Sequence, residues 1–171
     1  MEIQPEETIG YWLFYSQRCA EYAFFEALKR CCAEQGKAYV VTPPQWGILS
    51  ALFFEQQGLP IGALSQRRGF DAPTITGIVK RLEQSGLVER QHDREDRRVV
   101  KVYLTAEGRN IMPALFAAVT QFNATMMQSF SSAEQKDLMD KIQQIIVNLG
   151  AVAPGTGDRF HLLPHHLYET E

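Results

Sequence analysis

The sequence predicts a mainly α-helical fold (α+β) that contains one short β-hairpin. Three observations support this prediction. Apolar residues recur at helical spacing in six segments. Glycines and capping residues separate these segments. The period then changes to a partial alternation in two short stretches, GLVERQH and RVVKVYLT. With 171 residues, of which 45% are hydrophobic, the chain can form one domain or two small units that share a core.

The helices before the hairpin are separated by glycines. Residues 8–34 carry an apolar stripe, and Gly36 follows it. A second helix is expected after Thr42, a candidate N-cap, and ends at Gly58. A short third helix ends at Gly69. The side chains expected to face inward from these helices are Ile9, Trp12, Leu13, Cys19, Ala23, Ala27, Leu28, Cys31, Trp46, Leu49, Leu52, Phe53, Ile61 and Leu64.

The fourth helix leads into the hairpin. Asp71 is its expected N-cap, because aspartate accepts hydrogen bonds from the free amides of a first turn. The helix is expected to run from Ala72 to about Ser85. The two β-rich stretches follow, and the charged run DREDRR, residues 93–98, joins them at the tip of the hairpin. The side chains expected to face inward from this helix are Ile75, Ile78, Val79 and Leu82.

Two helices are expected after the hairpin. Thr105 is the candidate cap of a long helix over residues 106–130, which Pro113 is expected to bend. Ser131 and Glu134 have the spacing of a capping box, which predicts one last helix. The side chains expected to face inward from these two helices are Ile111, Leu115, Val119, Phe122, Leu138, Ile142 and Ile145.

The order of these elements predicts a winged helix-turn-helix with a two-stranded wing. In this arrangement the second helix of the motif enters a major groove about 12 Å wide and reads base edges there. An arginine on the wing reaches a neighbouring backbone or minor groove, where the negative potential favours it. The predicted partner is therefore double-stranded DNA.

The charge distribution fits this prediction. Residues 65–101 contain nine Lys and Arg against six Asp and Glu, a net +3, within a chain whose net charge is −3. The remainder has eight basic against fourteen acidic residues, a net −6. Positive charge is therefore local to the predicted winged segment, as a nucleic-acid footprint on an acidic body requires. A solvated charged surface without a partner is the alternative explanation.

Four motifs in order, TPPQWGIL, GLVER, DREDRR and LTAEG, resemble those of the MarR family of bacterial transcriptional regulators. The resemblance runs without gaps over about residues 42–108. It implies a homodimer that binds a palindromic operator and usually represses transcription. Many such proteins release DNA when a small phenolic or carboxylate compound binds or when a cysteine is oxidised. The segments it implies are N-terminal dimerisation (1–41), winged DNA-binding domain (42–106), C-terminal dimerisation helices (107–149) and a tail (150–171).

The candidate DNA-binding residues lie off the apolar stripe of the fourth helix and on the wing. Threonine hydroxyls can bond phosphates or base edges, and lysine and arginine neutralise phosphates. Many relatives carry a larger side chain where this chain has Gly77, and Arg81 can alternatively pair with a nearby carboxylate. The candidates are Thr74, Thr76, Gly77, Lys80, Arg81, Arg94 and Arg97.

The family pattern also assigns roles within the wing. Asp96 and Arg98 resemble the structural pair of the family, whereas Arg94 and Arg97 resemble the arginines that face DNA. From the residues alone, Asp93 and Asp96 are expected to brace arginines in position.

A small aromatic or carboxylate ligand is a further possible partner. In the family, a pocket forms where the first, second and fifth helices meet the winged domain, and Arg18 can hold a carboxylate there. The alternative is that these aromatic residues form only the dimer core and surface. The candidate pocket residues are Tyr15, Arg18, Tyr22, Trp46 and Phe116.

The cysteines and histidines suggest neither a cofactor nor a metal. Cys19, Cys31 and Cys32 are expected to be reduced structural thiols, with a redox-responsive regulator of the same fold as the alternative. The tail contains His161, His165 and His166 without a nearby carboxylate or cysteine cluster. No cofactor is therefore expected.

Two other classes of protein are weighed against a regulator. The sequence has no Cys–His–acid constellation and no phosphate loop, which argues against an enzyme. A winged-helix protein-interaction module without DNA binding is the other alternative, and the intact arginine wing argues against it. No apolar run reaches the roughly 18 residues of a membrane helix, and the acidic N-terminus lacks a secretory signal. The expected compartment is the cytoplasm.

Overall fold

A computed structural model of the chain describes residues 4–55, 57–93 and 96–149. These residues divide into two compact units. One unit comprises residues 4–43 and 113–126, and the other comprises residues 44–112 and 127–149. We call the second the winged unit, because it contains the helix-turn-helix and the wing.

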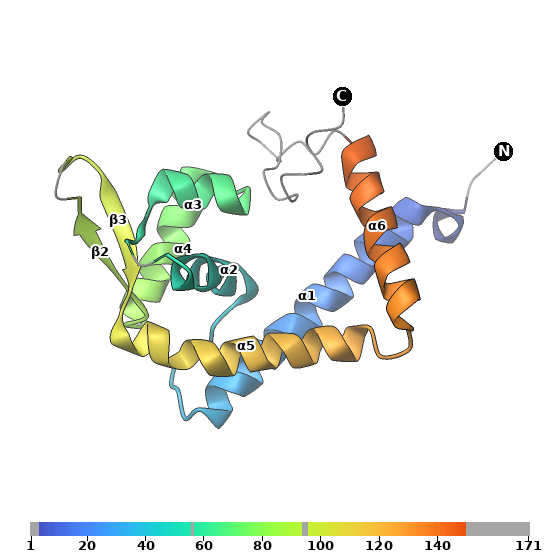
Figure 1. Ribbon diagram of the computed structural model, residues 1–171, viewed down its shortest axis with the longest axis horizontal. Coiled ribbons are helices and arrows are strands. Elements are labelled where there is room, and N and C mark those ends of the chain that lie inside the picture. Colours follow the sequence, from blue (N-terminus) through green and yellow to red (C-terminus); the bar gives the residue numbers. More distant parts are fainter. Residues whose placement is uncertain (1–3, 56, 94–95, 150–171) are drawn as a thin grey trace. The chain divides into compact units, whose positions relative to one another are not determined.

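The structure is mainly α-helical with one small sheet (Figure 1), as the sequence predicts. The helices are η1 (Pro5–Glu7, a 3-10 turn), α1 (Ile9–Glu34), α2 (Pro43–Phe53), α3 (Ile61–Arg68), α4 (Ala72–Gln84), α5 (Ala106–Met126) and α6 (Ser132–Asn148). The strands are β1 (Leu59–Pro60), β2 (Val88–His92) and β3 (Val100–Leu104). Helix α5 ends before the expected residue 130, in a turn closed by the amide of Phe130 and the carbonyl of Met127 at 3.0 Å.

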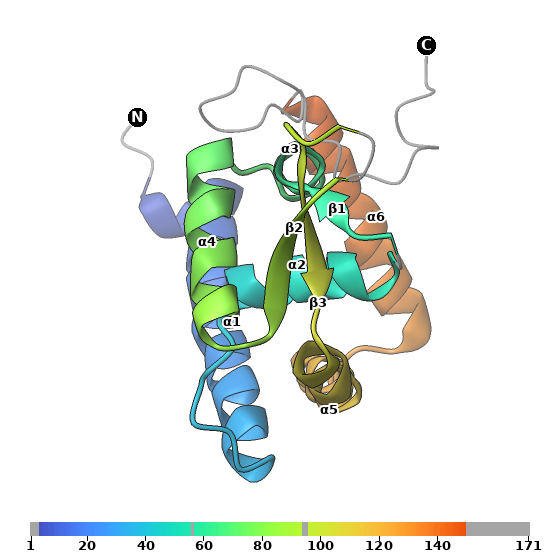
Figure 2. The ribbon, with the colours of Figure 1, turned by 90° about the vertical axis from the view of Figure 1, so that its left-hand side faces the viewer.

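The sheet has three antiparallel strands in the order β1-β3-β2, with β3 in the middle (Figure 2). The predicted two-stranded wing is the hairpin of β2 and β3, whereas the third strand of the sheet, β1, was not predicted. The missed strand is two residues long and pairs Leu59 with Val102 and Pro60 with Lys101. So short a strand has no alternation of its own, and only the tertiary fold defines it.

Local capping explains where several helices begin. The side chain of Asp71 accepts a hydrogen bond from the amide of Thr74 at 2.7 Å, and Ser131 and Glu134 form the predicted capping box. The Thr105 hydroxyl accepts a hydrogen bond from the amide of Gly108 at 3.0 Å at the start of α5. These bonds satisfy amides that have no partner inside the helix, so the caps fix the helix starts as predicted.

The core of the winged unit lies beneath α4. All four predicted inward residues of α4 are buried, whereas Trp46 and Phe53, also expected to face inward, are only partly buried. Each fully buried aliphatic side chain contributes about 1.5–3 kcal/mol to folding. The buried core residues of this unit include Ile48, Leu49, Leu52, Leu64, Ile75, Ile78, Val79, Leu82, Leu87, Val102, Leu104 and Met112.

Helices α1 and α6 are less buried than their apolar stripes predict. On α1, Leu28 and Cys31 are buried, but Ile9 and Trp12 are exposed. On α6, Ile142 is exposed and no residue is fully buried. The expectation that these side chains face inward is wrong for the single chain. The periodicity identifies an apolar face correctly, but it does not show what covers that face.

A glycine and an arginine are fitted together in the winged unit. The guanidinium of Arg68 lies where a Cβ at Gly47 would be, with Cζ at 2.6 Å and Nε at 2.7 Å from that position. Burial lowers the pKa of Arg68. Its Nε and the Oγ of Ser65 are buried and have no hydrogen-bond partner among the described residues. Because Gly47 has no side chain, the partly buried guanidinium of Arg68 from α3 can pack against the backbone of α2.

Gly108 closes the junction between the wing and α5. A Cβ at this position would collide with the carbonyl oxygen of Leu87 and lie 3.1 Å from its carbonyl carbon. That oxygen also accepts a hydrogen bond from the amide of Thr105 at 3.2 Å, and the Thr105 hydroxyl donates to the carbonyl of Gly86 at 2.7 Å. The backbone around residue 87 is held on several sides and cannot move away easily.

Gly108→Ala should therefore destabilise the protein by about 1–3 kcal/mol, since the new methyl group meets fixed backbone rather than a movable side chain. Urea unfolding monitored by circular dichroism measures this change. Gly62→Ala is the matched control, because a Cβ at Gly62 of α3 would meet no atom within 4 Å in the part of the chain that the structure describes. Equal stabilities of the two variants would contradict the proposed packing.

Candidate nucleic-acid interface

Because one face of α4 is buried in the core, the residues of its opposite face point outward. Ile75, Ile78, Val79 and Leu82 point into the core of the winged unit. Because side chains three and four positions apart share a face of a helix, the remaining positions form one outward surface. We call this surface the outer face of α4, and its members are Thr74, Thr76, Gly77, Lys80 and Arg81, of which all but the partly buried Gly77 are exposed.

The charged residues of the outer face are available for a partner. Neither Lys80 nor Arg81 forms an ion pair with any described residue, so the alternative pairing of Arg81 with a carboxylate is not observed there. The Thr76 hydroxyl donates to the carbonyl of Ala72 at 2.8 Å, which leaves its oxygen as an acceptor. Two cations and two threonines thus lie on one exposed helical surface.

Gly77 is unusual in this position. It is an interior residue of a 13-residue helix, where glycine costs about 0.8–1 kcal/mol relative to alanine. A Cβ at residue 77 would meet no atom of the described residues within 4 Å. Its backbone is not in the left-handed conformation that favours glycine.

The N-terminus of α4 is fixed by its cap. Hydrogen bonding by Thr74 lowers the pKa of the Asp71 carboxyl, which stays ionised at neutral pH. A carboxylate at a helix N-terminus is also favoured by the helix dipole. The first turn of α4 is therefore well defined.

The wing is a regular antiparallel hairpin with a buried base and an exposed end. Its register pairs Val88 with Leu104 and His92 with Val100. Val88, Val102 and Leu104 are buried, whereas the rest of β2 is exposed. The base is therefore anchored in the core, and the hairpin extends away from it.

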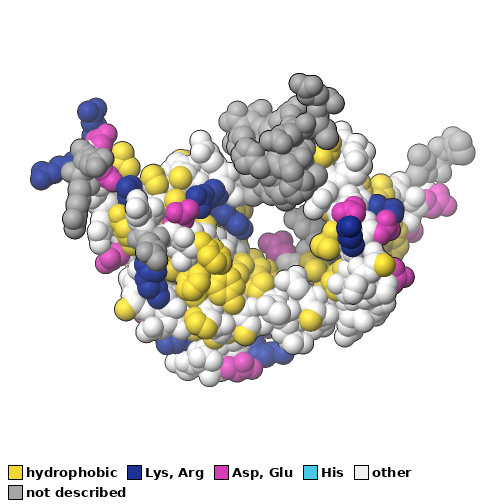
Figure 3. Space-filling model, viewed as in Figure 1, with side chains coloured by type: hydrophobic (Ala, Val, Ile, Leu, Met, Phe, Trp, Pro, Cys, Tyr) yellow, Lys and Arg dark blue, Asp and Glu magenta, His cyan; other side chains and the backbone are white. Residues whose placement is uncertain are grey.

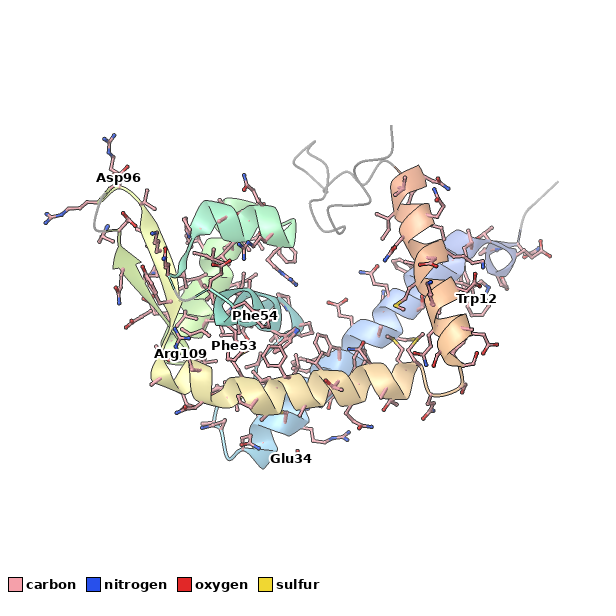
Figure 4. The ribbon with its side chains drawn as sticks, viewed as in Figure 1. Trp12, Glu34, Phe53, Phe54, Asp96 and Arg109 are labelled. Atoms are coloured by element: carbon pink, nitrogen blue, oxygen red, sulfur yellow. The ribbon has the colours of Figure 1, made fainter. Side chains whose placement is uncertain are left out.

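The tip of the wing is held by aspartates that accept hydrogen bonds from the backbone. Asp93 Oδ1 accepts from the amide of Asp96 at 3.1 Å, and Asp96 Oδ1 accepts from the amide of Arg98 at 2.9 Å. The Nε of Arg98 lies 3.6 Å from Asp96 Oδ1, but its side chain is 95% exposed. Asp96, labelled in Figure 4, thus contacts the backbone of the turn more closely than the guanidinium.

A histidine adds a contact across the tip. The Nδ1 of His92 lies 2.8 Å from the carbonyl oxygen of Arg97. Because a carbonyl can only accept, this contact requires a proton on Nδ1. The backbone of Arg97 is therefore held while its side chain is exposed. Sequence analysis did not identify His92, because no periodic pattern or motif marks it.

One ion pair attaches the wing to α4 and another lies within the wing, and sequence analysis missed both. Arg90 of β2 binds Glu83 of α4 through Nε at 3.0 Å and Nη2 at 2.6 Å. Hydrogen bonding between them lowers the pKa of the Glu83 carboxyl and raises that of Arg90. Lys101 Nζ lies 2.6 Å from Asp93 Oδ2, with both side chains largely shielded. The first pair orients the wing relative to α4 and the second joins β3 to the tip of the wing, while their net stabilisation is small.

Exposed positive charge also lies at the wing tip. Figure 3 shows Lys and Arg side chains there, at the upper left of the view. Arg97 and Arg98 are exposed, whereas Arg90 and Lys101 are engaged in ion pairs. Arg94, the other predicted DNA-facing arginine, lies outside the described residues.

The five candidate pocket residues are distributed over both units. Tyr15, Arg18 and Tyr22 are exposed on α1, and Arg18 Cζ lies 5.8 Å above the centre of the Phe14 ring. Phe116 of α5 is partly buried in the same unit as α1.

Trp46 of α2 is partly buried and belongs to the winged unit. Tyr15, Arg18 and Tyr22 are one or two turns apart on α1, so they share a face of that helix.

The cysteines differ in exposure. Cys31 and Cys32 are buried, and burial raises the pKa of both thiols. Cys19 is exposed. A raised pKa disfavours the thiolate, which is the reactive form.

No group of three or more potential metal ligands occurs among the described residues, and none of the described helices is long and apolar enough to span a membrane. The three tail histidines, His161, His165 and His166, lie outside the described residues.

Comparisons with known proteins agree with this geometry. The model of the MarR family matches residues 41–100. The regulator YsmB of Bacillus subtilis, described as an uncharacterised HTH-type transcriptional regulator, is 34% identical over 105 residues, 59% of this chain and 71% of its own length. A probable transcriptional regulator from Pseudomonas aeruginosa has a similar structure, with a TM-score of 0.71 and 28% identity over 84% of this chain and all of its own.

The fold is also similar to that of BpsR from Bordetella bronchiseptica, whose DNA binding is regulated by 6-hydroxynicotinic acid. The TM-score is 0.71 and the identity 19%, over 85% of this chain and 97% of that one. At this identity the likeness concerns the fold alone.

Proposed function

The chain belongs to the MarR family of DNA-binding transcriptional regulators, and we propose that it is a homodimeric repressor that binds a palindromic operator and is released by a small aromatic or carboxylate compound. The observation that carries this proposal is the outer face of α4 beside a hydrogen-bonded arginine wing. Lys80 and Arg81 on the helix and Arg97 on the wing are exposed cations on elements fixed by the same core.

The two elements have different tasks in this proposal. Residues of α4 contact base edges and phosphates in a major groove, whereas the wing arginines contact an adjacent backbone or minor groove. The ion pair between Glu83 and Arg90 links these elements, so the spacing of the two contacts is set before DNA binds. Preorganised contacts lose less conformational entropy on binding.

Exposed apolar side chains on the outermost helices support the homodimer. A single chain leaves large hydrophobic residues in water on both α1 and α6, and such surfaces mark interfaces. Twofold symmetry of the protein would match a palindromic operator, since each winged unit reads one half-site. The exposed residues are Ile9, Trp12, Phe14, Tyr15, Tyr22, Met139, Ile142 and Val147; Trp12 is labelled in Figure 4.

The proposed effector is an aromatic carboxylate held by Arg18. Arg18, Tyr15 and Tyr22 share one face of α1, so a cationic side chain and two aromatic side chains are available to a ligand on that face. The raised pKa of Cys31 and Cys32 argues against these two thiols as redox sensors.

The wing prediction uses the double variant Arg94→Ala/Arg97→Ala. Operator affinity should fall, and the slope of log affinity against log salt should flatten by about 0.9 for each phosphate that the protein no longer neutralises. The fold should survive, because Arg97 is exposed and contributes nothing to the core. Fluorescence anisotropy over a salt series measures both quantities.

The charge-matched control is Lys29→Ala/Arg30→Ala, which removes two exposed cations from α1. It should leave the salt slope nearly unchanged. If the wing variant also keeps the wild-type slope, the charged hairpin is only a solvated turn, and its assignment to DNA binding is wrong.

The dimer prediction concerns α6. Sedimentation of the full chain should give twice the 19.4 kDa of one chain. Ile142→Glu should shift the protein towards monomer, because it places a charge in the proposed interface while the side chain is exposed in the single chain. Gln144→Glu, on the same helix, is the control. A wild-type monomer at concentrations on the order of micromolar would exclude the dimer.

The effector prediction concerns Arg18→Ala. Loss of a charge-assisted hydrogen bond typically costs about 1.5–3 kcal/mol, so roughly 10- to 100-fold more benzoate or 6-hydroxynicotinate should be needed to release DNA. Operator affinity without these compounds should not change. If neither compound alters wild-type operator affinity, the proposal of release by aromatic carboxylates fails.

A further inference from the structure

The interior glycines of the helices differ in what surrounds them. At Gly47 of α2, the guanidinium of Arg68 occupies the place of a side chain. At Gly108 of α5, the carbonyl of Leu87 does so. At both positions, therefore, a contact within the chain explains why the residue is glycine.

Gly77 of α4 has no such explanation, because no atom of the described residues lies within 4 Å of a Cβ there and its φ is not positive. Gly10 and Gly62 also have open space, but each is the second residue of its helix, whereas Gly77 is the sixth residue of the 13-residue α4.

The position of Gly77 on the helix indicates why a glycine is present there. It is on the outer face of α4, three residues after Thr74 and three and four residues before Lys80 and Arg81. Side chains at these spacings are neighbours on a helix surface. The bare Cα is thus surrounded by the side chains proposed to contact DNA, in the middle of the surface that would enter the groove.

We propose that Gly77 is a specificity-determining residue that acts by having no side chain. Its bare Cα allows the backbone of α4 to approach base edges in the major groove more closely than any other residue would permit. The flanking Thr74, Lys80 and Arg81 then reach their contacts from this closer position. The inference rests on the proposed function, since it presupposes that the outer face of α4 meets DNA.

The chemistry of this discrimination is steric. Glycine has no side-chain donor or acceptor, so it reads a base pair only by the space it leaves. The base edges of the major groove differ in shape as well as in hydrogen-bonding groups, the C5-methyl group of thymine being the largest apolar projection. An added methyl at residue 77 would therefore disfavour some base pairs more than others, and the preferred operator would change.

The test separates folding from recognition, because the two make opposite predictions for Gly77→Ala. Alanine is the better helix former, and no described residue opposes its Cβ, so Tm should rise by roughly 2–8 °C. Affinity for DNA selected by the wild-type protein from a random-sequence duplex library should nevertheless fall at least about fivefold. Affinity for an unrelated duplex should not change, because phosphate contacts remain.

Gly62→Ala is the matched control, since Gly62 also lies in a helix of the winged unit with open space around its Cβ. It should leave both DNA affinities unchanged. A second selection with the Gly77→Ala protein should yield a different base preference at one position of each half-site. A purely structural glycine would not produce that change.

Each result bears on a definite claim. If Gly77→Ala binds the selected duplex as tightly as the wild type and selects the same sequence, Gly77 does not determine specificity. A fall in Tm would assign the glycine to folding and also overturn the inference. If the wild-type protein enriches no sequence at all, the proposed operator binding fails, which is distinguishable from failure of the role of Gly77 alone.

Discussion

The burial of one stripe of α4 is the constraint on which the winged unit depends. Successive residues of a helix are about 100° apart, so a rotation of α4 by one residue would move Ile75 and Ile78 out of the core and Lys80 towards it. Several buried aliphatic side chains, each contributing about 1.5–3 kcal/mol, oppose such a rotation. The outer face of α4 is therefore fixed by residues that are themselves buried in the core. Its chemistry can vary without loss of the fold.

The wing shows how an acidic chain can present a basic edge. Asp93 and Asp96 accept hydrogen bonds from the backbone of the tip, and Glu83 fixes Arg90 beside α4. These carboxylates are engaged within the chain, so they hold the hairpin in shape. Arg97 is exposed instead. A count of charges treats all of these residues alike, whereas the structure separates the charges that hold the wing from those available to a polyanion.

The sequence predicted what local interactions determine. Asp71, Thr105 and the box of Ser131 and Glu134 fix helix starts by bonds within a few residues, and the 3.6-residue period identified the buried face of α4. What was missed depends on distant parts of the chain. Strand β1 exists only because β3 pairs with it, the Glu83–Arg90 pair joins a helix to a strand, and Gly47 accommodates Arg68 from another helix. No periodic pattern records such contacts.

Two features of the chain are unfavourable in isolation, and both point to partners outside it. Apolar side chains such as Trp12 and Ile142 are exposed on α1 and α6, although burial of such surface would be favourable. Gly77 weakens α4, and no described atom requires it to be glycine. The exposed apolar faces of α1 and α6 would be buried favourably against another apolar surface. At Gly77, the empty space suits a partner that approaches the helix backbone closely. A second copy of the chain fits the first feature and a base-pair edge fits the second, so the two proposals are independent and either can fail without the other.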